Sequence, residues 1–276
     1  MYDLHSHLLP NIPGDDGARS YDMAYHMARQ SLTAGFSHVI ATSHFVAGEP
    51  FGRREDLQAA ARAISKFLLG KGMPLEIIPA HEAYLTPELI DHVKSREVIL
   101  IGNRYLLLEL PMTGWMRETF SLLSDLNAMG VKVIIAHPER CAALQENPDL
   151  AVELIDSGAY LQLNLGSLKY THTSTGKTAL KLLKYNMYHF VGTGAHSDQK
   201  RSPLVQEELA LLKKITSHTY FAQITRENAA LAVKGIDFDN SFDESWTSFD
   251  REDRAVPFNL RTNIWQRLEA WRFARR

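Results

Sequence analysis

Cysteine is nearly absent from this sequence, and its scarcity excludes several kinds of protein. Cys141 is the single cysteine among 276 residues, so the chain forms no internal disulfide and no zinc site built on paired cysteines. A chain that uses no disulfide needs no oxidising compartment. We therefore expect the protein to act in the cytoplasm.

Long apolar runs and an excess of one charge are also missing. The chain holds 30 basic and 32 acidic residues, and no stretch approaches the length of an apolar membrane span. Its first residues show no basic segment followed by an apolar one, so we expect no export signal and no membrane insertion. The balanced charge gives no reason to expect a nucleic-acid partner. Nothing in the composition favours one oligomeric state over another.

What the sequence does contain is a regular alternation of short apolar runs and longer segments of helical period. The apolar runs predict strands at 2–4, 38–41, 76–79, 105–109, 132–136, 160–164 and 190–193. Apolar positions three or four apart predict helices at 18–35, 53–70, 86–95, 115–129, 148–158, 174–185 and 203–215. Strict alternation of strand and helix indicates a parallel sheet, and seven units at this length favour a closed, TIM-like β/α barrel.

The regular pattern stops near residue 235, which predicts a barrel domain, 1–235, and a C-terminal tail, 236–276. The tail is first acidic, with seven acids and one base between residues 237 and 253. Its end is basic and amphipathic: residues 261–276 hold five arginines and one acid, and Ile264, Leu268 and Trp271 share one helical face. Arginines in such a segment are more often a solvated face than a binding patch.

Histidines and carboxylates follow the predicted strands, at the ends where a β/α barrel carries its chemistry. These residues are His5, His7, His44, Glu82, Glu109, His137 and His196. The pair His5 and His7, taken alone, is more often a solvated or capping pair than a metal site; as ligands, one ring could be oriented by Asp3. Glu109, however, directly follows three leucines, and a carboxylate in so apolar a strand needs a metal or another partner. The recurrence at strand after strand therefore predicts a metal site.

The ordered set of motifs resembles the polymerase and histidinol phosphatase superfamily, and within it the bacterial manganese-dependent protein tyrosine phosphatases of capsule and exopolysaccharide synthesis. The resemblance spans residues 1–235 and is carried by 3-DLHSHLLPNIPGDDGA-18, 41-ATSHF-45, 79-PAHE-82, 108-LELP-111, 136-AHPER-140, 162-QLNLGSL-168 and 193-TGAHSD-198. It implies a distorted seven-stranded parallel barrel that holds up to three divalent metal ions, with manganese preferred and iron or zinc as alternatives.

The resemblance also implies a role for each matching residue. One metal would be bound by His5, His7 and Glu82, a second by Asp16, His44 and His196, and a third by Glu109 and His137, with Glu82 as a bridge. Arg140 and Arg201 would bind phosphate oxygens, for which guanidinium groups are suited.

Two positions depart from the family pattern. The family has an aspartate ligand two residues before the last histidine, where this chain has Gly194, so Asp198 or a water would have to replace it. The motif 14-GDDG-17 lies farther from His7 than in the family, which leaves Asp15 and Asp16 as alternatives for one ligand.

The function implied by the resemblance is hydrolysis of phosphotyrosine on a protein, by attack of a metal-bound hydroxide, with a bacterial tyrosine kinase of polysaccharide export as the partner. Two alternatives remain open: hydrolysis of a small phosphate monoester such as histidinol phosphate or a nucleotide, and a phosphoprotein-binding regulator whose catalysis is weakened by Gly194. A cysteine-dependent mechanism is excluded, because its phosphate loop needs an arginine six residues after the thiol and Asn147 stands there.

Overall fold

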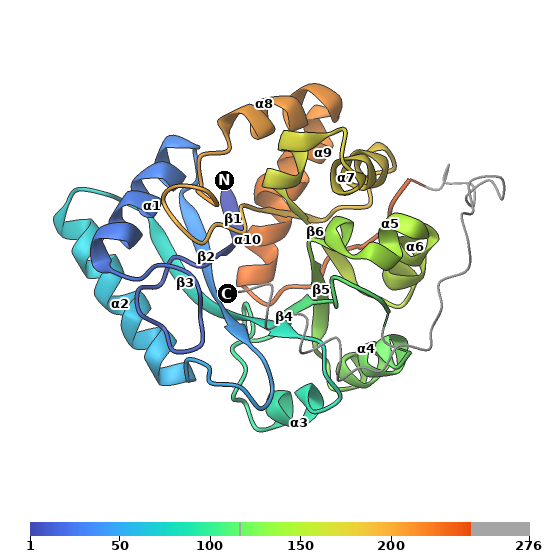
Figure 1. Ribbon diagram of the computed structural model, residues 1–276, viewed down its shortest axis with the longest axis horizontal. Helices are drawn as coiled ribbons and strands as arrows, with labels where there is room; N and C mark the ends of the chain where they lie inside the picture. The colour runs from blue at the N-terminus through green and yellow to red at the C-terminus, as the bar shows by residue number, and fades with distance from the viewer. Residues whose placement is uncertain (116, 244–276) are drawn as a thin grey trace.

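Seven parallel strands form the centre of the molecule, and the helices surround them (Figure 1). The computed structural model describes residues 1–115 and 117–243. The strands are neighbours in chain order, from β1 to β7. They span Tyr2–Ser6 (β1), His38–Phe45 (β2), Glu76–Tyr84 (β3), Tyr105–Glu109 (β4), Lys132–Ala136 (β5), Tyr160–Asn164 (β6) and Phe190–Gly192 (β7). The predicted parallel β/α barrel is therefore confirmed.

All seven predicted helices are present, each slightly shorter than its pattern suggested. They are α1 (Tyr21–Thr33), α2 (Arg54–Gly70), α3 (Leu89–Lys94), α4 (Thr119–Ala128), α6 (Asp149–Asp156), α7 (Ser174–Lys184) and α8 (Gln206–Ile215). Among the described residues, the α-helices that were not predicted are α5 (Ala142–Glu146), α9 (His218–Ala222) and α10 (Asn228–Val233). The five residues of α5 show too few repeats of the helical period. Helices α9 and α10 are joined without a break by the π-helical segment η3 (Gln223–Glu227), whose wider turn interrupts that period. Within residues 1–115 and 117–243, none of the helices has the length and apolar character needed to cross a membrane.

Alternation along the strands decides which side chains enter the barrel. Ile40, Ala80 and Leu107 belong to one buried cluster inside it, whereas alternate residues of β2 pack in a separate cluster with α1 and α2. Glu82 comes two residues after Ala80, and Glu109 two residues after Leu107, so both carboxylates share the face of this apolar layer. The polar cluster described below is thus built onto the end of an apolar barrel core.

The barrel closes between β1 and β7 through contacts that differ from a regular ladder. Gly194 donates its N–H to the carbonyl of His5 (2.7 Å), and a second backbone bond of 2.8 Å joins His7 to the same loop. The buried Asp3 carboxylate accepts from both the N–H and the hydroxyl of Thr193, at 2.8 and 2.6 Å. These contacts fix the loop after β7 beside the histidines of β1.

Residues 236–243 run along the opposite end of the barrel, where the strands begin. The hydroxyls of Tyr105 and Tyr160 donate to the carbonyls of Ile236 and Phe238, each at 2.7 Å, and the Phe238 ring packs on both tyrosine rings. A separate tail starting at residue 236 stays a prediction, but the described part of that segment lies against the barrel. The rest of the acidic run and the arginine-rich segment lie outside the described residues.

Candidate metal centre

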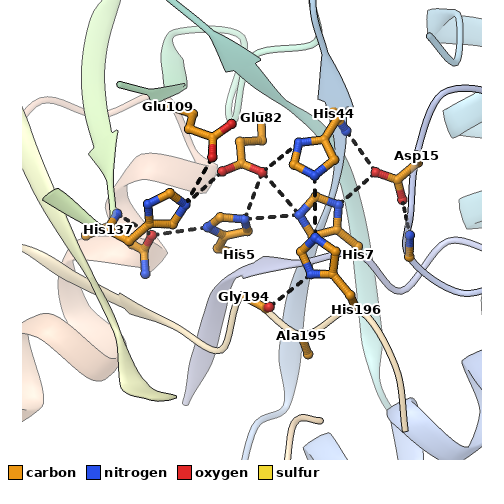
Figure 2. Close-up of polar contacts among 12 residues, drawn as sticks. His5, His7, Asp15, His44, Glu82, Glu109, His137, Gly194, Ala195 and His196 are labelled. Carbon is orange, nitrogen blue, oxygen red and sulfur yellow. Dashed lines mark hydrogen bonds and ion pairs between the residues drawn. The ribbon is translucent and has the colours of Figure 1, made fainter. Parts of the chain in front are cut away.

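The structure brings all eight predicted metal ligands together at the end of the barrel where the strands end. All of them except Asp16 are labelled in Figure 2. Their ligand atoms converge within 4.8 Å of one another in three groups: His7, Asp16, His44 and His196; His5, Glu82 and His137; and His44, Glu82 and Glu109. Strand register explains part of this convergence, because His44 of β2 lies directly opposite Glu82 of β3. All of these residues except Asp16, whose side chain is 38% exposed, are buried.

Glu82 lies at the centre of the cluster. Its Oε2 atom is 3.1 Å from Nε2 of His5, 3.1 Å from Nε2 of His7 and 3.1 Å from Nδ1 of His44. Its Oε1 atom is 3.1 Å from Nε2 of His137. One buried carboxylate therefore contacts ligands from all three metal sites implied by the family resemblance.

The adjacent residues Asp15 and Asp16 contact different atoms of the cluster. Oδ1 of Asp16 lies 3.2 Å from Nε2 of His44 and 3.0 Å from Nε2 of His196. Oδ1 of Asp15 lies 2.8 Å from Nδ1 of His7 and accepts the backbone N–H of His44 at 2.9 Å. Asp16 thus faces the same side as the converging ring nitrogens, whereas Asp15 holds the far side of the His7 ring.

The surroundings keep the carboxylates charged and His137 neutral. Burial opposes the charge of Asp15, but the neighbouring histidines outweigh burial and lower its pKa from 3.8 to about 2. The same balance places the pKa values of Asp16 and Glu82 well below their ordinary range. Burial lowers the pKa of His137 to about 3. Ionised carboxylates and neutral imidazoles are the forms that bind divalent metals.

The positions of the polar atoms in the cluster suit the binding of cations better than they suit hydrogen bonds between these atoms. Asp16 Oδ1 and Glu82 Oε2 are buried and make no hydrogen bond of good geometry among the described residues, although ring nitrogens lie close to both. The Nε2 atoms of His5 and His7 face each other at 3.1 Å. Separations of this size are edges of a coordination polyhedron whose metal–ligand bonds are about 2.0–2.2 Å long. The residues present therefore fit divalent metal ions.

Two guanidinium groups approach the cluster from neighbouring loops. Arg140 belongs to the 3-10 turn η1 (Pro138–Arg140), directly after His137. Arg201 follows β7 and donates from Nη2 to the carbonyl of Gly194 (3.1 Å). Burial lowers the pKa of Arg201, the charge of Arg140 lowers it further, and the carboxylates of the cluster oppose both effects. The two arginines are thus close enough to repel each other, and an anion between them would relieve that repulsion.

Gly194, at the position where the family resemblance predicts an aspartate, contributes through its backbone. Its φ is +54°, and its carbonyl lies 3.0 Å from Nδ1 of His196 in addition to accepting from Arg201. A Cβ atom at this position would lie 2.7 Å from Nδ2 of Asn164. Asp198, the other candidate for the missing ligand, belongs to none of the three groups found among the described residues.

Two buried residues beside the predicted metal ligands, Gln162 and Glu139, were not predicted from the sequence. Oε1 of Gln162 lies 3.2 Å from Nδ1 of His5 and accepts the N–H of His137 at 3.3 Å. Glu139 is completely buried, and burial raises its pKa. A glutamine in the middle of an apolar strand was the available signal for Gln162. Asp3, expected to orient a ring, instead accepts the backbone N–H of His5 at 3.2 Å, and the ring faces Gln162.

The barrel and the cluster at its C-terminal end define a class, the metal-dependent β/α-barrel hydrolases. Within it, the chain belongs to the CpsB/CapC family of capsular polysaccharide synthesis, which matches residues 1–234. The tyrosine-protein phosphatase YwqE of Bacillus subtilis is 32% identical over 236 residues, which cover 85% of this chain and 92% of that protein. The tyrosine-protein phosphatase CpsB of Streptococcus agalactiae serotype V is 26% identical over 243 residues, covering 85% and 98%.

The fold of a solved structure supports the assignment of this chain to the family. It is a crystal structure from work on YwqE of Bacillus subtilis and CpsB of Streptococcus pneumoniae, described as unique metal-dependent tyrosine phosphatases. It is 30% identical in sequence, and the match covers 91% of this chain and 100% of the other with a TM-score of 0.82. The predicted family, barrel and enzyme class, a metal-dependent phosphatase of the tyrosine phosphatase type, are therefore confirmed.

Proposed function

We propose that this chain removes phosphate from phosphotyrosine on protein substrates, with Arg140 and Arg201 binding the phosphate beside a centre of divalent metal ions. The observation that carries the proposal is the convergence of eight histidine and carboxylate side chains beside two guanidinium groups: Arg201 donates to the Gly194 carbonyl at the edge of this cluster, and the charge of Arg140 acts on Arg201. Like charges so close are unfavourable unless an anion compensates them. A phosphate group has the charge and the oxygen atoms for that position.

The proposed ligand sets are those that the family resemblance implies, and contacts within the cluster support each of them, although the three groups of converging atoms divide the same residues differently. They are His5, His7 and Glu82 for one ion, Asp16, His44 and His196 for a second, and Glu109 and His137 with the shared Glu82 for a third. When bound, the ions would add positive charge beside the phosphoryl group and lower the pKa of a coordinated water. Mixed nitrogen and oxygen ligands suit manganese, with iron or zinc as alternatives.

The rest of the chemistry belongs to the chain's own groups. Arg140 and Arg201 hold the non-bridging oxygens and neutralise their charge as the ester bond breaks. A tyrosine phenolate is a tolerable leaving group, since the phenol has a pKa of about 10. Cys141 takes no part, because it is buried and burial raises the pKa of its thiol, which leaves no thiolate to attack.

We infer a tyrosine kinase of polysaccharide export as the partner, and the cytoplasm as the place of action. The family carries the description of capsular polysaccharide synthesis, and relatives at 32% and 26% identity carry the name tyrosine-protein phosphatase. Phosphotyrosine is made by kinases from ATP, so enzyme and substrate would meet where ATP is available. Phosphatase activity toward such a kinase in its phosphorylated form is the expectation.

Removal and return of metal tests the proposed function. Chelation should abolish turnover of a phosphotyrosine peptide, manganese should restore it, and His137→Ala should stay inactive at every metal load. His26→Ala, on the outer helix α1, is the matched control and should behave as the unaltered protein. Faster hydrolysis of histidinol phosphate or a nucleotide would contradict the protein substrate. Tight peptide binding without turnover at any metal load would contradict the enzyme.

A further inference from the structure

We propose that Glu139 is a positioning residue that holds the turn carrying His137 and Arg140 in the orientation required to bind phosphate. The inference deepens the proposed function and rests on it. It begins from a buried acid that the proposed chemistry does not use: Glu139 is 0% exposed and lies between a predicted metal ligand and a predicted phosphate ligand. A buried carboxylate at such a place needs partners, and their positions indicate its role.

Three neutral donors meet the Glu139 carboxylate. Oε1 accepts the backbone N–H of Asn164 at 3.0 Å and the hydroxyl of Ser167 at 2.7 Å. Oε2 accepts the hydroxyl of Tyr188 at 3.0 Å. Because each of these bonds requires a direction as well as a distance, together they fix the carboxylate in one position.

These bonds tie the η1 turn, which follows β5, to the next two strands. Asn164 ends β6, Ser167 lies in the following 3-10 turn η2 (Leu165–Tyr170), and Tyr188 comes just before β7. The main chain is held as well, since the carbonyl of Glu139 accepts from Nε2 of Gln145 at 2.8 Å. With side chain and backbone both anchored, the residues on either side of Glu139 have little freedom to rotate.

The turn needs an anchor because its first residue has an unfavourable backbone conformation. His137 has φ +34° and ψ +55°, in the left-handed region that residues with a Cβ atom disfavour. In this conformation its Nε2 lies 3.1 Å from Glu82, while Arg140 donates its N–H back to the His137 carbonyl at 2.9 Å. One turn thus presents both side chains. Without Glu139, the turn could relax toward more favourable backbone angles, and the side chains of His137 and Arg140 would move away from the metal and phosphate sites.

A second reading is that Glu139 serves stability alone, and the two readings predict different measurements. A purely structural residue would change the melting temperature of the barrel and leave the phosphate affinity of the folded protein unchanged. A positioning residue changes the affinity of the folded protein for phosphate. Inorganic phosphate is the appropriate probe, because it needs the arginines and metals but no tyrosine.

The test compares Glu139→Ala and Glu139→Gln with the unaltered protein, each loaded with manganese. Titration calorimetry with inorganic phosphate, metal content per chain, and kcat and KM for a phosphotyrosine peptide are measured. Glu139→Ala should weaken phosphate binding and raise KM by about 10- to 100-fold, the usual effect of losing a residue that orients a site. Glu139→Gln should recover most of this loss, because its oxygen still accepts and the Tyr188 hydroxyl can accept instead of donating. Glu153→Ala, an exposed acid on α6, is the matched control and should change nothing.

A double mutant shows whether Glu139 acts through Arg140. In the Arg140→Ala background, Glu139→Ala should have little further effect on phosphate affinity, because residues that act together are not additive. Full additivity, or unchanged phosphate affinity and KM in Glu139→Ala, would overturn the proposal. If Glu139→Ala does not fold, Tyr188→Phe and Ser167→Ala remove single donors, and unchanged phosphate affinity in both would overturn it equally. A protein whose phosphate affinity depends on Glu139 but which does not hydrolyse the peptide would refute the proposed substrate and leave this inference intact.

Discussion

Asp15 and Asp16 are neighbours in the chain but contact opposite sides of the histidine cluster. Asp16→Ala should lose bound metal and nearly all turnover, because it removes an oxygen that faces His44 and His196. Asp15→Asn should keep the metal under excess manganese and lose about 10- to 100-fold in affinity or activity, since it weakens only the support of the His7 ring. Metal content by mass spectrometry and peptide turnover check both. A larger metal loss in Asp15→Asn would make Asp15 the ligand.

Gly194→Asp introduces the residue that the family resemblance predicts at this position, yet we expect it to lower activity. A Cβ at residue 194 would lie 2.7 Å from Nδ2 of Asn164, and adjusting the backbone would disturb the carbonyl that contacts His196 and Arg201. Phosphate affinity and turnover should both fall, with Gly194→Ala showing the same steric effect without a carboxylate. A clear gain of activity in the aspartate variant alone would instead mean that this chain lacks a ligand which the substitution supplies.

At the scale of single residues, seven of the converging ligands could be predicted because they lie at the ends of predicted strands, whereas Asp16 lies in the loop after β1 and was one of two alternatives in a family motif. Glu109 could be recognised from the sequence alone, because a carboxylate directly after three leucines lies in an apolar strand and needs a partner. Gln162 and Glu139 are different, since their importance lies in partners on other strands: Gln162 faces His5, which is 157 residues away in the chain. A single sequence contains no direct record of such pairs.

Among the elements, a buried histidine directly before β7, His189, links three segments. His189 accepts the N–H of Leu161 on Nδ1 (3.1 Å), and its Nε2 donates to the carbonyl of Asn240 (2.9 Å). Burial lowers its pKa from 6.5 to about 4. Between pH 6.5 and pH 4 the unfolded chain therefore binds a proton at this histidine that the folded chain does not bind. The free energy of unfolding consequently falls as the pH drops from 6.5 toward 4.

His189→Gln should remove this part of the acid sensitivity. Between about pH 7.5 and pH 5 the free energy of unfolding of the unaltered protein should fall by roughly 2 kcal/mol more than that of the variant. Denaturant unfolding at the two pH values measures this, and protonation of the metal ligands cancels because both proteins share them. His26→Gln on the surface of α1 should keep the full slope. Equal slopes for His189→Gln and the unaltered protein would contradict the assignment.

The elements themselves were largely predictable, and the differences have physical causes. The glycines that follow α1, α4 and α6, namely Gly35, Gly130 and Gly158, have φ values of +92°, +78° and +91°, a conformation that favours glycine and ends a helix. Strands β2 and β3 run past their apolar segments to Phe45 and Tyr84. Their polar ends remain in the ladder because His44 and Glu82 pair with each other inside the cluster, which an apolar pattern does not reveal.

For the whole molecule, closure of the barrel depends on residues at opposite ends of the chain. Asp3 binds Thr193 across 190 residues, and Tyr105 and Tyr160 bind residues 236–238 at the other end of the barrel. The alternation of strands and helices predicted a barrel. The two contacts that complete it were not predictable, because a short polar motif and a segment after the last helix have no periodicity to interpret.

The segment 236–243 gives a last prediction, which tests where the barrel domain ends. A chain shortened to residues 1–235 should be less stable than one of residues 1–243, because it loses the carbonyls that accept from Tyr105 and Tyr160 and uncovers the surface under Phe238. The two tyrosine hydrogen bonds and the partly buried Phe238 ring amount to roughly 3 kcal/mol, or about 6–12 °C in melting temperature for a domain of this size, and loss of the hydrogen bonds of Asn240 adds to this. Phe238→Ala in the full chain should show the apolar part of this loss. Metal content and turnover of the folded fraction should be unchanged in all of them, since the segment lies at the end of the barrel away from the predicted metal ligands. Equal melting temperatures for the two shortened chains would place the boundary at residue 235, as the sequence pattern alone predicts.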